Sequence, residues 1–413
     1  MEFGRIVTEC RMCGSSKLYR FLDLGFAPPA DAILSSEEIR EHEIHFPLNV
    51  LQCMDCGLTQ LGYAANPSHL YGKKYKYESS ITETGRNHFH SMALSLVKRF
   101  NLTNDALVID IGSNVGVLLE GFKNEGLRVL GIEPVKYLAD IANKKGIETF
   151  NSFINWEAAQ KIVQEKGKAK IVSGTNVFAH IDDKHDLMKS VEILLDDEGV
   201  FVIEAPYLVN LIENLEYDTI YVEHLEYTSI KPLVSFFNKY NMEVFDVERY
   251  DIHGSSVRVF ISRKGKREIS PHVGELLKLE DELGIYDKNV LDEFSLRVKN
   301  HRKELLNLLN ELKLQGKRVM GISAPAKGNT ILNYCKIGPD IIEYITEKSG
   351  IKPGHHTPGM HIPIMSEDIL KKDSPDYGII FAWNFAEEIM KNNKEFAERG
   401  GKFIIPIPHP VIR

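Results

Sequence analysis

Four of the five cysteines form two pairs whose spacing is typical of metal-binding sites. Cys10 and Cys13 stand in C-R-M-C-G, and Cys53 and Cys56 stand in C-M-D-C-G. A C-x-x-C turn directs both thiolates at one point, and the following glycine permits a tight backbone. Four such ligands predict a tetrahedral Zn²⁺ site with no open coordination position, and therefore a structural metal. Two disulfides, or four unrelated thiols, are the alternatives.

A second chemical pattern follows an apolar run. ALVIDIG (106–112) predicts a buried strand that leads into the turn G-S-N-V-G, which contains Gly112, Asn114 and Gly116. The glycines allow the backbone to approach a ligand closely, and Asp110 places a carboxylate near the strand end. Glu133 ends the next predicted strand, RVLGIEP, where an acid is expected to bind ribose hydroxyls.

This turn favours one of two cofactors. A dinucleotide-binding turn has the pattern G-x-G-x-x-G, whereas here an acidic residue comes first. The Asp110 carboxylate suits the cationic aminoacyl group of S-adenosylmethionine and would sit badly near a pyrophosphate. We therefore expect S-adenosylmethionine, with NAD as the alternative. Phe153, beside the adenine, and Asn176, at the carboxyl edge of the sheet, complete the predicted cofactor site. Core packing is the alternative for Phe153.

Two stretches carry residues suited to acid–base chemistry. Y-V-E-H-L-E-Y-T-S (221–229) crowds Tyr221, Glu223 and His224 into four residues. The histidine could serve as a general base near neutral pH, and its neighbours could orient it or polarise a substrate oxygen. Y-G-K-K-Y-K-Y-E-S-S (71–80) has three tyrosines that could line a pocket or cap the following helix. Spacing alone fits a structural role equally well for either stretch.

The elements that position these residues fall into successive parts. Residues 1–75 are short-stranded and loop-rich, and helical spacing follows from Thr82 to Phe100. Strand and helix patterns then alternate up to VRVFISRKG (257–265), which predicts a doubly wound parallel sheet. A charged, Leu-rich stretch at 291–316 predicts a linking helix, and the alternation restarts after it. The fold class is therefore α/β, with a second, smaller α/β unit at the end.

Composition excludes several classes of protein. The 413 residues exceed a single core, and 43% hydrophobic with 26% charged residues is typical of a soluble globular chain. The net charge of −8 and the lack of long Lys/Arg runs argue against nucleic acid as a partner. No apolar stretch is long enough to span a membrane, and no signal peptide is recognisable, so we expect the cytoplasm. No sequence feature predicts an oligomeric state.

In combination, the motifs resemble those of the three-domain, S-adenosylmethionine-dependent sugar C-methyltransferases, which act on nucleotide-linked keto-deoxyhexoses. The resemblance covers nearly the whole chain. It rests on C-R-x-C-G, F-L-D-L-G (21–25), C-x-x-C-G-L-T-Q (53–60), Y-E-S-S (77–80), D-I-G-S-N-V-G, N-V-F-A-H (176–180), Y-x-E-H-x-x-Y-x-S, I-H-G-S-S-V-R (252–258), A-P-A-K-G-N-T (324–330), F-A-W-N-F (381–385) and the terminal G-G-K-F-I-I-P-I-P.

The resemblance implies a division of the chain and an active site between its parts. It implies a zinc-binding module (1–75), a Rossmann-like methyltransferase domain (76–265), a linking helical segment (266–315) and a Rossmann-like C-terminal domain (316–413). Carried over by motif, His224 resembles the base that removes a ring proton beside a keto group. Its surrounding shell would be Tyr75, His180, Tyr221 and Glu223.

The implied reaction is C-methylation of a nucleotide-linked 4-keto-deoxysugar at C-3. Lys327 and Asn329, in A-P-A-K-G-N-T, and Arg258 are candidates for contacts with the sugar or phosphates, although the turn could be a simple strand-to-helix corner. His355 and His356 depart from the pattern expected for their loop. An O- or N-methyltransferase on the same scaffold, or a non-catalytic assembly protein, are the alternatives.

Overall fold

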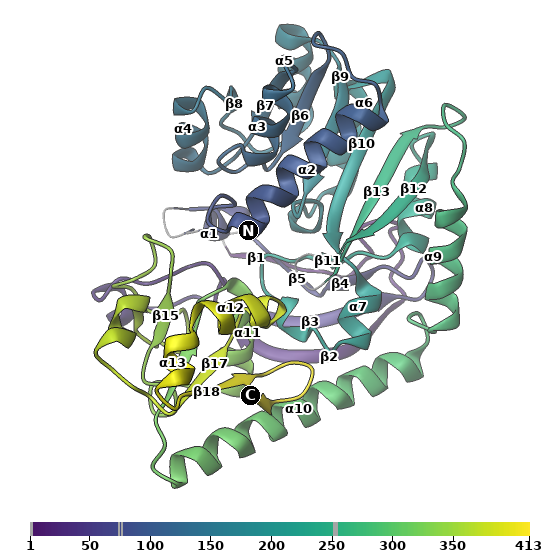
Figure 1. The fold of residues 1–413 in the computed structure, drawn as a ribbon. Helices are drawn as coiled ribbons and strands as arrows, with labels where there is room; N and C mark the ends of the chain where they lie inside the picture. Colours follow the sequence, from purple (N-terminus) through teal and green to yellow (C-terminus); the bar gives the residue numbers. More distant parts are fainter. Residues whose placement is uncertain (1–2, 73–74, 76, 251–254) are drawn as a thin grey trace.

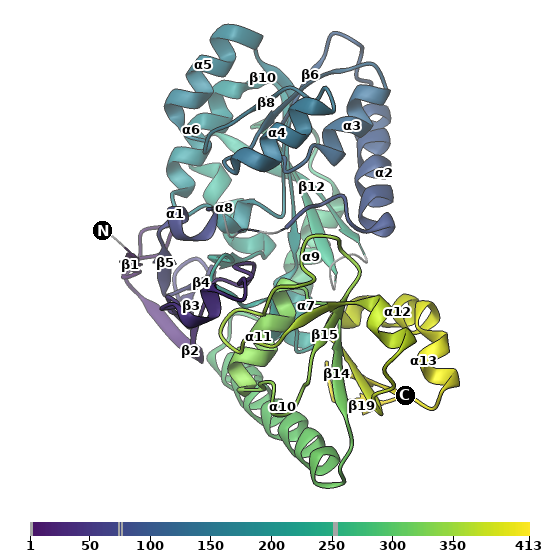
Figure 2. The ribbon, with the colours of Figure 1, turned by 90° about the vertical axis from the view of Figure 1, so that its left-hand side faces the viewer.

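The computed structural model describes residues 3–72, 75, 77–250 and 255–413. The N-terminal module and the C-terminal domain lie side by side beneath the central domain (Figures 1 and 2). Within the described residues, no helix has the length and apolar character needed to cross a membrane.

The N-terminal module is built on antiparallel strands, and two of them, β2 with ten residues and β3 with eight, are longer than the short strands expected. Its four-stranded sheet has the order β11-β4-β3-β2, so one of the strands comes from far along the chain. That strand, β11, belongs to the Tyr-Glu-His stretch of the central domain and pairs with β4. The bounds are β1 Gly4–Ile6, β2 Leu18–Ala27, β3 Phe46–Cys53, β4 Thr59–Leu61, β5 Tyr63–Ala65, β11 Glu226–Tyr227 and the short helix α1 Pro67–Leu70.

The central domain has a seven-stranded sheet in the order β12-β13-β10-β9-β6-β7-β8. One face is covered by α2, α3 and α4, and the other by α5, α6 and α8, which confirms a doubly wound sheet. The strands are β6 Leu107–Ile111, β7 Arg128–Ile132, β8 Thr149–Phe150, β9 Ala169–Thr175, β10 Leu195–Pro206, β12 Met242–Tyr250 and β13 Ser256–Arg263. The helices are α2 Glu83–Arg99, α3 Val117–Asn124, α4 Lys136–Lys144, α5 Trp156–Lys166, α6 Lys184–Leu194, α7 Leu208–Glu213 and α8 Ile230–Asn238.

The expected parallel pairing is present in five strands of the central sheet, β10, β9, β6, β7 and β8, but not in its last two along the chain. Strand β13 runs antiparallel to β10, and β12 runs antiparallel to β13. Only five residues join β12 to β13 (251–255). A parallel pair needs a crossover of about a dozen residues or more, so this short connection permits only an antiparallel hairpin.

The predicted linking helix is α10 (Lys288–Leu314), preceded by α9 (Pro271–Glu282). It buries one face, including Leu291, Phe294 and Leu305, and runs below β2 (Figure 1). The C-terminal sheet has the order β16-β15-β14-β17-β18-β19 and is parallel except for β19. Its elements are β14 Val319–Ile322, α11 Ala326–Cys335, β15 Ile345–Glu347, β16 Ile364–Ser366, β17 Tyr377–Ile380, α12 Ala386–Asn392, α13 Lys394–Glu398, β18 Lys402–Ile405 and β19 Val411–Ile412.

Candidate active site

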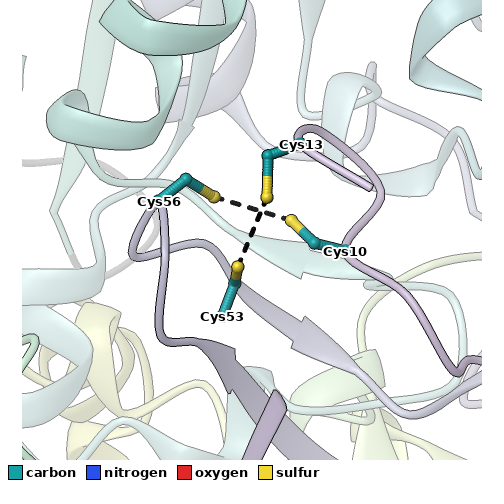
Figure 3. Close-up of side chains that lie close together, drawn as sticks. All are labelled: Cys10, Cys13, Cys53 and Cys56. Atoms are coloured by element: carbon teal, nitrogen blue, oxygen red, sulfur yellow. Dashed lines mark hydrogen bonds between the residues drawn. The ribbon is translucent and has the colours of Figure 1, made fainter. Parts of the chain in front are cut away.

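The four paired cysteines converge in the N-terminal module. Their sulfurs all lie within 4.8 Å of one another, with Cys10 Sγ 3.5 Å from Cys56 Sγ and Cys13 Sγ 3.4 Å from Cys53 Sγ (Figure 3). Tetrahedral Zn–S bonds of about 2.3 Å place sulfurs about 3.8 Å apart, so the cluster has the size that Zn²⁺ requires. All four cysteines are free thiols, which argues against the disulfide alternative. The set fits a closed, structural zinc site.

The glycine-containing turn joins β6 to α3. Gly112 and Gly116 both have positive φ, at 69° and 81°. A Cβ on Gly112 would lie 2.5 Å from Val177 Cγ2, and one on Gly116 would lie 3.0 Å from Ile147 Cγ2. Backbone conformation and packing within the protein therefore both require glycine at these two positions. The sequence had suggested a different reason, the close approach of the backbone to a ligand.

Asp110 is buried at the carboxyl end of β6. Its Oδ1 accepts a hydrogen bond from the Ser173 hydroxyl at 2.7 Å. Burial raises the pKa of Asp110 to about 7; the Ser173 hydrogen bond opposes this rise, whereas the charge of Glu133 adds to it. A nearby cation would stabilise the ionised form of this buried carboxyl group and lower its pKa. This site therefore fits the cationic aminoacyl group of S-adenosylmethionine.

Glu133 and Asn114 tie the turn to its surroundings. The backbone amides of Asn114 and Val135 donate to separate Glu133 oxygens at 2.9 and 2.7 Å. A carboxylate oxygen has two acceptor positions, so each can accept one more hydrogen bond, as the predicted contact with ribose hydroxyls requires. The Asn114 side chain accepts from Ser79 N at 3.1 Å and donates to Tyr77 O at 3.2 Å. The end of the tyrosine stretch thus packs directly on the predicted cofactor turn.

The remaining cofactor candidates lie at the carboxyl edge of the sheet. Phe153 is 46% exposed, and its ring centroid is 6.2 Å from that of Tyr71, so the packing alternative of a core position does not describe it. Asn176 follows β9 with φ of 54°, and its backbone amide donates to Glu204 O at 2.7 Å. Contact of either residue with the cofactor stays a prediction.

His224 is held in a defined tautomer. Its Nδ1 donates to the Thr219 carbonyl oxygen at 2.8 Å, so in the neutral ring Nε2 carries the lone pair. The Tyr221 ring lies over it, with 3.9 Å between centroids, and the His180 ring is 5.0 Å away. His224 as a whole is buried, with 8% of its surface exposed. Such an imidazole has the arrangement of a general base.

His180 lies between His224 and the N-terminal module. The Tyr71 hydroxyl and His180 Nδ1 are hydrogen bonded at 2.9 Å, and the two rings are stacked. Burial lowers the pKa of His180 well below its ordinary value, and the charges of His224 and Lys184 lower it further. His180 is therefore neutral at neutral pH, and it separates the Tyr71 hydroxyl from His224.

Glu223 and Tyr75 also come to this region. A Glu223 carboxylate oxygen accepts from the Asp31 backbone amide at 3.4 Å, and its Oε2 is buried with no partner among the described residues. Burial, with the charge of Asp31, raises the pKa of Glu223 to about 8. Tyr75 forms a β-bridge with Ala32, and its ring lies edge-on to Tyr71 at 5.5 Å. The structure thus brings together all five residues of the predicted catalytic group.

The three substrate candidates are not brought together. Lys327 Nζ donates to Asn384 Oδ1 at 3.3 Å and lies 5.0 Å from the centre of the Trp383 ring. Asn329 Nδ2 donates to Ala30 O at 2.6 Å, across the junction with the N-terminal module.

Arg258 lies apart from these two, within the central sheet. It is 1% exposed, and its guanidinium donates to Glu204 Oε2 at 2.6 and 2.9 Å and to the Tyr250 hydroxyl at 2.9 Å. Glu204 also binds His88 Nε2 at 2.6 Å. These protein partners give Arg258 a structural role in the described residues, and substrate contact by any of the three candidates stays a prediction.

Sequence reasoning missed three participants in the site. Tyr71 was visible only as one of three tyrosines, and Thr219 contributes a backbone oxygen, which has no sequence signal. Asp31 follows P-P-A in a loop that the sequence does not mark as functional.

Comparisons with known proteins agree with this architecture. A family model described as "Putative zinc binding domain" matches residues 10–71, "Methyltransferase domain" matches 86–247, and "C-methyltransferase C-terminal domain" matches 251–408. The chain is 37% identical over 410 residues to the C-methyltransferase NovU of Streptomyces niveus, covering 99% of this chain and 97% of the relative.

Solved structures give weaker likenesses. One is the magnesium protoporphyrin IX methyltransferase of Synechocystis PCC 6803 with bound SAM, at 14% identity and a TM-score of 0.33, covering 43% of this chain and 79% of that one. Another is an S-adenosylmethionine-dependent methyltransferase from Clostridium acetobutylicum ATCC 824, at 13% identity and a TM-score of 0.35, covering 44% and 92%.

The full-length relative and the three family models, in this order along the chain, agree with the four-cysteine cluster and the doubly wound central sheet. The chain is therefore a methyltransferase that belongs to the family of three-domain, S-adenosylmethionine-dependent sugar C-methyltransferases.

Proposed function

We propose that the protein methylates C-3 of a nucleotide-linked 4-keto-deoxysugar. The observation that carries this proposal is the His224 tautomer, in which Thr219 O fixes Nδ1 and leaves the lone pair on Nε2. A carbon next to a ketone is acidic enough for such a base, whereas an unactivated carbon is not. The full-length match to a C-methyltransferase supports carbon as the methylated atom.

The proposed reaction is a proton transfer from C-3 followed by a methyl transfer to C-3. His224 Nε2 takes the C-3 proton, and the electron pair of that C–H bond moves onto the keto oxygen as an enolate. Glu223, whose pKa burial raises to about 8, is protonated at neutral pH and can donate a hydrogen bond to developing negative charge. S-adenosylmethionine, when bound, would supply the electrophilic methyl group: as the enolate oxygen re-forms the ketone, C-3 bonds to the methyl carbon, the S–CH3 bond breaks with its electron pair left on sulfur, and S-adenosylhomocysteine leaves. Tyr71, Tyr75 and Tyr221 exclude water from this step.

Incubation with labelled S-adenosylmethionine and a panel of nucleotide-linked 4-keto-deoxysugars tests the proposal. We expect a new C-methyl signal at C-3 in the NMR spectrum of the product. Without methyl donor, the wild-type protein should exchange the C-3 proton with deuterated solvent, since that step needs only the base. An O- or N-methyl product, or none at all, would contradict the proposal.

The variant His224→Ala tests the base itself. We expect C-3 proton exchange and methylation to fall by about 10²- to 10⁴-fold, the usual contribution of a general base. Affinity for S-adenosylmethionine, measured by calorimetry, should stay unchanged. His409→Ala is the matched control, because His409 is an exposed histidine near the C-terminus that pairs with Glu304.

A further inference from the structure

The N-terminal module contributes a buried carboxylate, Asp31, to the region around His224. The loop that carries it is held from two sides. The Asp31 backbone amide donates to Glu223 of the central domain at 3.4 Å, and Ala30 O accepts from Asn329 of the C-terminal domain at 2.6 Å. Asp31 therefore lies where the three parts of the chain meet, and its backbone is fixed.

The Asp31 carboxylate accepts no hydrogen bond and forms no ion pair within the described residues, although the residue is only 7% exposed. The positive charge of Lys352 opposes the rise in the pKa of Asp31, but its ammonium donates its hydrogen bond to Ala324 O, at 2.7 Å. Burial raises the pKa of Asp31. A buried carboxyl group without a partner is costly, and natural proteins keep such groups where a ligand completes them.

The surroundings of this carboxylate are those of the proposed methylation pocket. Burial raises the pKa values of Tyr71, Tyr75 and Tyr221, and the negative charge of Asp31 raises each of them further. The backbone geometry agrees, because Ala32, the next residue, forms a β-bridge with Tyr75, and the Asp31 amide donates to Glu223. The same rings surround His180 and His224. Glu223 Oε2, which is buried with no partner in the described part of the chain, is a further sign that a polar ligand group belongs beside them.

We infer that Asp31 binds the substrate directly, by accepting a hydrogen bond from a ring hydroxyl next to the keto group. This inference rests on the proposed function, and it adds a specificity-determining residue to it. A site built to pair a hydroxyl rejects the analogue that lacks it, because the protein group is then left unpaired. Asp31 thus gives the zinc-binding module a part in choosing the sugar.

The test compares two sugars in the wild type and in Asp31→Asn. With the sugar that carries the hydroxyl, we expect the variant to lower kcat/KM about 10- to 100-fold, the value of one hydrogen bond to a charged group. With the analogue lacking that hydroxyl, the variant should equal or exceed the wild type. Asp23→Asn is the control, since Asp23 is an exposed carboxylate of the same module.

Unfolding temperature separates this role from a structural one. Because Asp31→Asn removes a buried, unpaired charge, stability should be unchanged or raised, whereas loss of a structural contact would lower it. Equal losses with both sugars, or no loss with either, would overturn the inference.

Calorimetric binding of the two sugars keeps this inference distinct from the proposed function. In one outcome, Asp31→Asn loses binding of the hydroxylated sugar alone, and the wild type makes no C-methyl product. That outcome would overturn the proposed function and support the inference. Unchanged binding of both sugars in a variant of an active enzyme would overturn the inference alone. A wild type that binds neither sugar would overturn both.

Discussion

At the scale of single residues, the raised pKa of Asp110 makes cofactor affinity depend on pH. Its pKa of about 7 comes mainly from burial. A cationic ligand binds the ionised form, so binding must release the proton that the buried carboxyl holds below that pH. We therefore expect the affinity for S-adenosylmethionine, measured by calorimetry, to rise as pH increases from about 6 to 8, by up to about tenfold per unit below 7.

The variant Asp110→Asn should weaken binding and remove this pH dependence. Asp105→Asn is a matched control, because Asp105 is an exposed carboxylate just before the same strand. A pH profile that is equally steep in Asp110→Asn would assign the titration to another group. Glu133 is the first candidate, since burial also raises its pKa.

At the scale of elements, the zinc-binding module supports the segment that carries His224. Leu61 N donates to Leu225 O, and Leu225 N donates to Ala179 O, so backbone hydrogen bonds run from β4 to the neighbours of both histidines. Arg11, inside the first C-x-x-C turn, donates to Asp182 at 2.8 Å and to Leu61 O at 2.8 Å. A disturbance of the C-x-x-C turn would therefore reach the predicted catalytic group.

We expect Cys53→Ser to lose zinc and to lower kcat for methylation about 10- to 100-fold, because small misplacement of a base is costly. Metal content by elemental analysis and affinity for S-adenosylmethionine are measured in parallel, and the affinity should not change. Cys335→Ser, which removes a thiol far along the chain, is the control. Full activity in a zinc-free Cys53→Ser protein would show that the module does not hold His224 in place.

Sequence patterns predicted the elements better than their assembly. The helical spacing from Thr82 to Phe100 correctly indicated α2, whose buried face includes Phe89, Met92 and Leu96, and the C-x-x-C pairs indicated one cluster. These signals are local and periodic. The pairing of β11 with β4 involves two residues of each strand, and no periodicity can reveal so short a contact. Asp31 was also missed, because only the tertiary contacts show that it is buried beside Glu223.

At the scale of the whole molecule, the proposed active site needs all three parts of the chain at once. Tyr71 and Asp31 come from the N-terminal module, His180 and His224 from the central domain, and Asn329 from the C-terminal domain. A loop of the C-terminal domain, residues 356–361, also contacts the N-terminal module. Glu43 there accepts hydrogen bonds from Gly359 N and His361 Nε2, and Leu34 forms a β-bridge with His356.

The hydrogen bond from Asn329 to Ala30 O tests whether this junction positions the substrate. Asn329→Ala leaves a buried carbonyl unpaired, which should lower the free energy of unfolding by about 1–3 kcal/mol in denaturant titration. Because Ala30 precedes Asp31, the change should also raise KM for the sugar.

Affinity for S-adenosylmethionine should stay constant in this variant, since its predicted site lies within the central domain. Asn393→Ala is the matched control: the Asn393 side chain donates to Ile389 O, within one turn of the same C-terminal domain. If Asn329→Ala and Asn393→Ala lost equal stability and left KM for the sugar unchanged, the C-terminal domain would contribute to folding alone. A raised KM specific to Asn329→Ala would mean that it acts on the sugar site through the Asp31 loop.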